Sequence, residues 1–360
     1  DFSRDAFFAM IGGVGGGRGA GARAPRAAVS ALARFNAWID RARNGLTDRI
    51  VDVVGGGLAP GAGAVAAALV TGKRGLIPEN ANASLRSAGI YHVVSISGLH
   101  MVLAAGLFLW LARGALAPVP GLALPRPITS WAALVAMAGA VAYDVFSGSE
   151  VATERSLIMT LVMLGAIVAG RRAISMRNLA LAALIVLARE PETLLGPSFQ
   201  MSFAAVAGLT AAFERGPGSE RATPDPDARF GLWGHRVRLV LWATVISTLV
   251  ASLATDPFST FHFHRLTPYG LIGNALTLPL VEFVVMPAAL VGVAVHPFGL
   301  DAPVWTVMGW GVTGMMAVAR YVAELPLSTL HIPAFGAGAL APMALGVVWW
   351  CLWASPLRWA

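Results

Sequence analysis

The sequence contains little cysteine and little charge. Its 360 residues include a single cysteine, Cys351, and only 12% of them are charged. One cysteine excludes an internal disulfide and a zinc site built from several thiolates. Soluble domains carry about a quarter of their residues as charges, whereas here 56% of the residues are hydrophobic. A soluble chain this apolar could not cover its surface with polar groups, so the composition indicates an integral membrane protein.

Two sequence signals are also missing. The chain has no Gly-x-x-x-x-Gly-Lys-Ser/Thr loop, so we expect no ATPase within it to power transport. Its first residues, Asp1 to Asp5, include neither a starting Met nor a basic stretch followed by an apolar core, and hence no signal peptide. We therefore interpret the chain as a piece of a longer protein.

Long apolar segments fill most of the chain after residue 92. Crossing the hydrocarbon core takes about 20 apolar residues, and the sequence predicts an all-α, polytopic transmembrane fold of about nine or ten spans. The segment 267–296 contains Pro279 and Pro287 and is expected to form either two short pieces or a broken helix that lines a cavity. The predicted spans are at about 93–112, 128–147, 151–169, 176–189, 197–213, 238–256, 267–296, 302–323 and 336–354.

Three regions follow from this pattern. Residues 1–26 are a flexible Gly/Arg-rich linker. Residues 27–92 are an amphipathic and re-entrant-like helical segment, which opens with a helix up to about Val54. That helix has an apolar face and an Arg-rich face, which favour either an interfacial position or packing on the rest of the protein. Residues 93–360 form the multi-span membrane domain.

Basic residues predict the orientation of the spans. The chain has 26 Lys and Arg against 19 Asp and Glu. One cluster lies at 171–177 and another at 215–238, two spans later, so that side should be cytoplasmic. Residues 18–92 would then lie outside although they are strongly basic, which runs against the rule. Either the topology is inverted, or these cations contact something outside, such as phosphates.

The densest polar cluster is His92, Ser95, Ser97 and His100, at the start of the first predicted span. Hydroxyls and imidazoles at this depth face protein or water rather than lipid. The window contains no carboxylate or cysteine for a metal site, and nothing points to an orienting acid or an oxyanion hole for hydrolysis. The two interpretations that stay open are the lining of a polar path and hydrogen bonding between helices.

Further polar residues enter the later spans. Glu154 and Arg155 lie inside an apolar run, so at least one of them must pair or face water. Gln200 and Ser202 enter another span, where an amide favours a partner on a neighbouring helix. His264 and Arg265 follow a run of aromatic residues, which is also typical of the interfacial belt. We expect no metal site and no cofactor.

Parts of the sequence resemble the ComEC competence-protein family. The likeness is carried by Gly72 to Pro78 and Arg86 to His100, followed by Gly148 to Arg155, Pro191 to Phe203 and His262 to Pro279. This resemblance implies an inner-membrane channel that passes one strand of DNA into the cytoplasm during natural transformation. Family members also carry an OB-like domain and often a metallo-β-lactamase-like domain, neither of which is complete here.

The resemblance predicts a channel rather than an enzyme, located in the bacterial inner membrane. The path-lining or DNA-binding candidates are His92, Ser95, Ser97, His100, Glu154, Arg155, Gln200, Ser202, His264 and Arg265. Expected partners are single-stranded DNA, membrane lipid, and other competence proteins such as a DNA receptor and a cytoplasmic helicase or ATPase, with a homodimer left open. The alternatives are a secondary transporter of a small molecule and an intramembrane Ser/His hydrolase.

Overall fold

The computed structural model describes residues 31–118, 127–214 and 232–352. The predicted linker at 1–26 and the side chains of the basic cluster at 215–238 lie outside what it describes. The chain divides into two compact units, residues 1–42 and residues 43–360. The arrangement below is that of the second unit.

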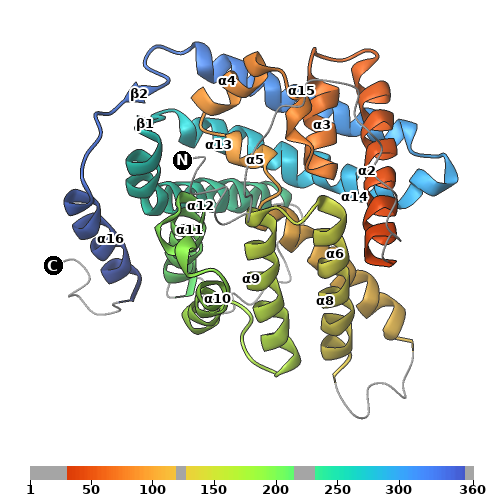
Figure 1. Ribbon diagram of the computed structural model, residues 1–360, viewed down its shortest axis with the longest axis horizontal. Coiled ribbons are helices and arrows are strands. Elements are labelled where there is room, and N and C mark those ends of the chain that lie inside the picture. Colours follow the sequence, from red (N-terminus) through yellow and green to blue (C-terminus); the bar gives the residue numbers. More distant parts are fainter. Residues whose placement is uncertain (1–30, 119–126, 215–231, 353–360) are drawn as a thin grey trace, which may run out of the picture. The chain divides into compact units, whose positions relative to one another are not determined.

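Helices make up almost all of the described secondary structure, which confirms the all-α prediction (Figure 1). The described residues also include two antiparallel strands of two residues each. The elements are α2 (Ala31–Gly55), α3 (Ala62–Thr71), η1 (Arg74–Leu76), α4 (Glu79–Ser87), α5 (Tyr91–Val94), α6 (Gly98–Leu116), α8 (Ile128–Ser147), α9 (Val151–Val168), α10 (Met176–Arg189), η2 (Pro191–Leu195), α11 (Pro197–Glu214), α12 (Leu232–Phe263), β1 (Arg265–Leu266), α13 (Gly270–Leu280), η3 (Val281–Val285), α14 (Met286–Val295), η4 (His296–Phe298), α15 (Ala302–Glu324), β2 (Leu330–His331) and α16 (Ala337–Leu352).

Five helical segments in the described residues are long and apolar enough to cross a membrane. They are Gly98–Leu116, Ile128–Ser147, Val151–Val168, Gly270–Phe298 and Ala302–Glu324. The predicted segment 267–296 is one helical run, interrupted by the π-helical turn η3. The segment is therefore not two separate pieces, and its lining of a cavity stays a prediction. The count of nine or ten spans stays a prediction.

The first span begins later than predicted. The sequence predicts a span from about residue 93, but α5 ends at Val94 and α6 begins at Gly98. Ser95 and Ser97, on either side of Ile96, have extended backbone angles. The helix restarts there because Ser97 and His100 form a capping box, in which each residue's side chain accepts from the other residue's backbone N–H.

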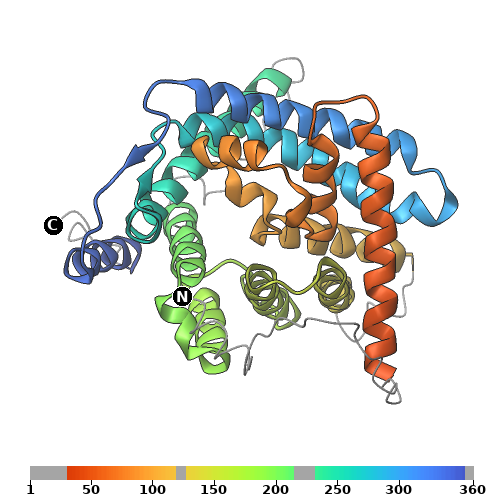
Figure 2. The same cartoon turned by 45° about the horizontal axis from the view of Figure 1, so that its top comes forward.

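The largest core joins residues 46–54 of α2 and the helices α3, α4 and α5 to α13, η3, α14 and α15, and we call this assembly the hub. In both views α15 lies along α4 and the α13–α14 run (Figure 1, Figure 2). Trp305 is fully buried, and its ring lies against Gly292 of α14, where any Cβ would overlap it. A glycine at that position lets α14 and α15 approach closely.

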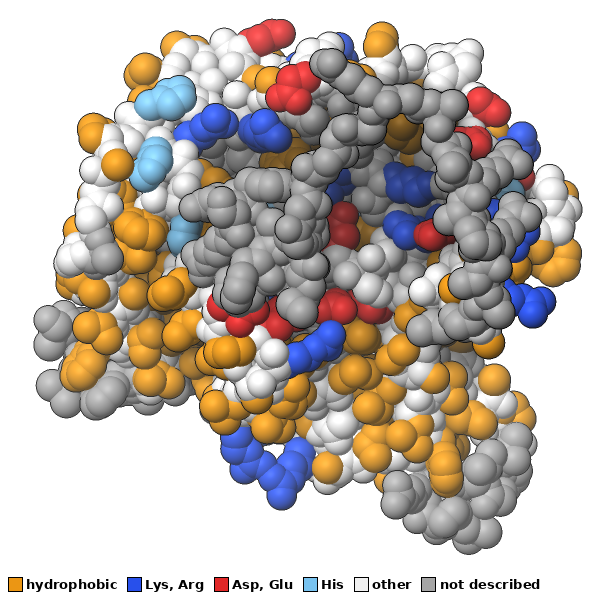
Figure 3. Space-filling view, in the orientation of Figure 1, with side chains coloured by type: hydrophobic (Ala, Val, Ile, Leu, Met, Phe, Trp, Pro, Cys, Tyr) orange, Lys and Arg blue, Asp and Glu red, His pale blue; other side chains and the backbone are white. Residues whose placement is uncertain are grey.

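The helices α6, α8, α9, α10, α11, α12 and α16 form a helix row with three smaller cores. These cores join α6, α8 and α9, then α9, α10 and α11, and finally α11, α12 and α16. Large apolar side chains on the row stay exposed, such as Leu184 at 65% and Leu253 at 64%. Hydrophobic side chains cover the lower part of the face in Figure 3, where these helices lie. Such surfaces suit lipid rather than water.

Arg43 of α2 connects the row to the hub. Its guanidinium donates to the carbonyl oxygen of Thr71 at 2.7 Å and to that of Ser147 at 3.1 Å, at the C-terminal ends of α3 and α8. A cation stabilises the negative end of a helix dipole, and here one cation serves two helices. Gly72 and Gly148 follow these ends with positive φ, and a Cβ on Gly148 would overlap the guanidinium.

Candidate functional site

Most of the predicted polar residues lie at one end of the helix row. Neighbouring helices of the row run antiparallel, so the starts of α6, α9 and α11 lie beside the ends of α8, α10 and α12 (Figure 1). Acidic side chains form a band near the upper ends of α9 and α11 in Figure 3. We call the polar side chains at this end of the row the polar rim, which consists of Ser97, His100, Glu150, Glu154, Arg155, Ser198, Gln200 and His262.

Ser97 and His100 contact each other at the start of α6. The backbone N–H of Ser97 donates to Nδ1 of His100 at 3.2 Å, and the Ser97 hydroxyl lies 3.1 Å from the same nitrogen. Nδ1 is therefore an acceptor, and the proton of the neutral ring sits on Nε2. His100 is completely buried, and its Nε2 has no hydrogen-bond partner. The contact that suggested a Ser/His pair is a helix cap, with no carboxylate on the second ring nitrogen.

His92 and Ser95 lie just before this cap. The side chain of His92 is exposed, and that of Ser95 is half-buried. The pKa of His92 is nevertheless lowered because the surrounding protein removes water from the ring, an effect larger than the opposing hydrogen bond to the Gly89 backbone.

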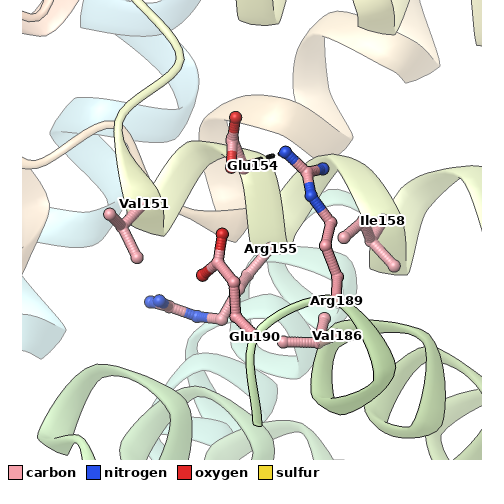
Figure 4. Close-up of a pocket in the computed structure, with 7 residues that line it drawn as sticks. All are labelled: Val151, Glu154, Arg155, Ile158, Val186, Arg189 and Glu190. Atoms are coloured by element: carbon pink, nitrogen blue, oxygen red, sulfur yellow. Dashed lines mark hydrogen bonds and ion pairs between the residues drawn. The ribbon is translucent and has the colours of Figure 1, made fainter. Parts of the chain in front are cut away.

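Glu154 and Arg155 have different partners, and both of them pair, as expected for at least one. Glu154 pairs with Arg189 of α10 at 3.5 Å, and Arg189 is 58% exposed. Arg155 donates from Nη2 to the Ser198 hydroxyl at the start of α11. Figure 4 shows the two side chains leaving α9 in different directions, with Glu190 close to the Arg155 stem.

Arg155 is the least satisfied charged side chain of the rim. It is only 4% exposed, yet its Nε and Nη1 have no hydrogen-bond partner. A guanidinium carries five N–H donors, and the contact with Ser198 uses one of them. Buried cations are normally paired, because leaving such donors unmade is energetically costly. This arrangement leaves hydrogen-bonding capacity for an anion.

Gln200 and His262 tie the next two helices together. Nε2 of His262 lies 2.9 Å from Oε1 of Gln200, and the Gln200 amide donates to the Leu194 carbonyl oxygen at 3.0 Å. The expected interhelical partner of Gln200 is therefore His262 of α12. Ser202 is half-buried and lies two positions further on, so it faces a different side of α11. His264 and Arg265 are exposed beyond the end of α12.

The sequence analysis missed several residues of this region. Arg74 of η1 pairs with Glu150 at 2.6 Å, which fixes the start of α9 to the hub side. Ser198 and Arg189 were not among the predicted residues, although both supply partners to α9. The available signal was their position: each stands within two residues of a helix end, where polar side chains gather.

These observations define a class of protein, a polytopic α-helical membrane protein with a polar rim at one end of its helices. The chain matches the Competence protein family over residues 69–357, and it belongs to that family. No solved structure gave a significant match.

Three curated relatives cover similar parts of the chain. Competence protein ComA of Neisseria gonorrhoeae is 32% identical over 68% of this chain and 32% of its own length. ComE operon protein 3 of Bacillus subtilis (strain 168) is 25% identical over 69% of the chain and 28% of its own length. The uncharacterized protein YcaI of Escherichia coli (strain K12) is 26% identical over 67% and 31% respectively. The matched part of the chain thus spans about a third of the length of these relatives.

Proposed function

We propose that this chain is the inner-membrane channel domain through which single-stranded DNA enters the cytoplasm during natural transformation. Membership of the Competence protein family and the relatives named for competence support a role in DNA uptake. The apolar helices support a membrane location. The polar rim supports the finer assignment, because a strand that crosses the bilayer needs polar groups along its way.

The observation that carries this proposal is the state of Arg155. Its guanidinium is held in α9 by a single hydroxyl, and two of its nitrogens are left without partners. Guanidinium groups bind phosphate oxygens through charge-assisted hydrogen bonds, often in pairs. The nearby start of α11 adds the positive end of a helix dipole. Arg155 therefore suits a transient contact with the phosphates of a passing strand.

The orientation of the rim follows from the charges at the other end of the row. Arg171 and Arg172 follow the C-terminal end of α9 and are exposed. Basic side chains gather at the lower end of the face in Figure 3. The positive-inside rule makes that end cytoplasmic, so the rim faces outward and receives the incoming strand.

The channel works together with other components. Since the sequence has no ATP-binding loop, the energy to move the strand comes from partners, such as a cytoplasmic helicase or ATPase, while a DNA receptor delivers it. Lipid surrounds the exposed apolar faces of the row. The proposal includes a pore formed by two copies of the chain.

Transformation frequency at normal protein level tests the proposal. Arg155→Ala removes the free donors, and Ser97→Leu removes the cap that positions the start of α6, so we expect both variants to take up DNA poorly. Arg172→Ala serves as the matched control, because it removes an exposed arginine at the opposite end of the row. Wild-type uptake by both rim variants would contradict the site assignment.

A further inference from the structure

Strands β1 and β2 bring together two segments that are far apart in the sequence. Arg265 lies opposite His331, and Leu266 lies opposite Leu330. The ladder is extended by the N–H of Ile332, which donates to the carbonyl oxygen of His264 at 3.0 Å. The link between α15 and α16 is thereby fixed beside the end of α12.

This short ladder presents basic side chains on one face. Side chains directly opposite each other in an antiparallel pair share a face, with Cβ atoms about 5 Å apart. Arg265 and His331 are both exposed, as is the adjacent His264. Histidine side chains gather beside Lys or Arg side chains at the left edge of Figure 3, over β1 and β2. In the described part of the chain, neither Arg265 nor His331 forms an ion pair with a carboxylate.

His264 occupies a backbone conformation that histidine rarely adopts. Its φ is +52°, and its N–H donates to the Thr260 carbonyl oxygen at 2.9 Å, so it closes α12 in the left-handed region. Glycine is the usual residue at this position of a helix end. Glycine would adopt this conformation without strain, so the outlier points to a use for the imidazole.

Aromatic rings flank the basic side chains. Phe261 contacts the His262 ring at 5.0 Å and the Phe335 ring at 5.7 Å, both edge to face. Phe263 is 53% exposed. His262 is also the partner of Gln200, so these rings adjoin the polar rim. Sites for single-stranded nucleic acids combine cationic groups that follow the backbone with aromatic rings on which bases stack.

We infer that His264, Arg265 and His331, together with the exposed ring of Phe263, form a contact site for the sugar–phosphate backbone and bases of single-stranded DNA at the edge of the rim. This inference rests on the proposed channel function. Arg265 supplies the fixed charge, and the two imidazoles supply N–H donors to phosphate oxygens. His331 adds to the site a residue from the segment between α15 and α16.

Binding of a fluorescent 20-nucleotide oligo-dT to the chain in zwitterionic nanodiscs tests this site, with affinity read by anisotropy at two salt concentrations. We expect the double variant Arg265→Ala/His331→Ala to bind about tenfold more weakly or worse, with a smaller salt slope. His264→Gly should also weaken binding while thermal stability is kept or raised. The matched control Arg171→Ala/Arg172→Ala removes two exposed arginines elsewhere and should change affinity by less than about twofold.

Three results would overturn the inference. The first is wild-type affinity in the double variant, and the second is an equal loss in the matched control. The third is a loss of binding in both the double variant and His264→Gly that follows a loss of thermal stability. Such a result would make these residues an interfacial anchor. If the double variant and His264→Gly bind normally while Arg155→Ala still abolishes transformation, this contact site is wrong and the channel proposal stands. No binding by the wild-type chain would contradict both.

Discussion

Asp301 in the hub and Arg155 in the helix row are both charged side chains buried in the protein, but their surroundings differ. Both oxygens of Asp301 are occupied: Arg49 donates to each at 3.3 Å, and Trp305 and His296 lie within 2.9 Å of Oδ2. Arg155 has one hydrogen bond, to Ser198, with the carboxylate of Glu190 close by, and two of its nitrogens have no hydrogen-bond partner.

This difference separates groups that hold the fold from groups that are free to act. A fully partnered buried charge stabilises one arrangement, because removing the charge leaves all its partners unpaired. A partly partnered charge contributes less to the fold and keeps donors for a ligand. The hub therefore provides rigidity, and the rim of the helix row provides the polar contacts.

The largest stability loss is expected from Asp301→Ala. It would leave the Trp305 N–H and the Arg49 guanidinium without their acceptor, and we expect unfolding free energy in detergent to fall by about 3 kcal/mol. His296→Ala removes a single partner whose side chain is 40% exposed and should lose about 1 kcal/mol. Equal effects of the two changes would show that the carboxylate is not the centre of this contact.

Acid should weaken the hub through the same carboxylate. The pKa of Asp301 is held below its usual range, chiefly by the hydrogen bond from Arg49, with help from His296 and Trp305. The stabilisation is thus complete above about pH 4, the unfolded value, and is lost as pH falls toward the lower folded value. The unfolding temperature of the wild type should drop between pH 7 and pH 3. In Asp301→Asn the drop should be smaller, because the part due to protonation of Asp301 is absent.

Gly148→Ala tests the connection between the row and the hub. Gly148 has a φ of +100°, and its Cβ would displace the Arg43 guanidinium from the ends of α3 and α8. We expect a loss of about 1–2 kcal/mol. Gly106 of α6 has nothing within 4 Å of a built Cβ, so Gly106→Ala is the matched control and should gain about 0.5–1 kcal/mol. Equal stability of the two variants would argue against the role of Arg43.

The smallest effect is expected from Glu154→Gln in the rim. The pair of Glu154 with Arg189 is long and mostly exposed, and such pairs contribute less than about 1 kcal/mol. Chemical denaturation should barely distinguish this variant from the wild type. A loss as large as that of Asp301→Ala would abolish the distinction between hub and rim.

The sequence alone predicted the parts that depend on local pattern. The span 128–147 coincides with α8, because a uniform apolar run sits between Pro127 and Gly148. Five of the rim residues were also recognised as candidates: Ser97, His100, Glu154, Arg155 and Gln200. These residues lie at one end of the row because neighbouring helices joined by short loops run antiparallel. The predicted span boundaries already placed each of them near the end of a span.

What was missed depends on distant partners. The break at Ser95–Ser97 lies inside the predicted span 93–112, and only the capping contact of Ser97 with His100 reveals it. Arg49 and Asp301 are 252 residues apart in the chain, and no spacing rule connects them. The same holds for Arg265 and His331, which meet only because β1 and β2 pair.

The most direct test of the account compares stability with uptake in Arg155→Met. This change replaces a poorly partnered charge with an apolar side chain of similar length, so the unfolding free energy should stay within about 1 kcal/mol of the wild type. Transformation frequency should nevertheless fall by at least about tenfold, since charge-assisted contacts to the strand are lost. Arg320→Met, the same change at an exposed position of α15, should leave both quantities unchanged. Arg155→Met with normal transformation, or with a stability loss as large as that of Asp301→Ala, would contradict the account.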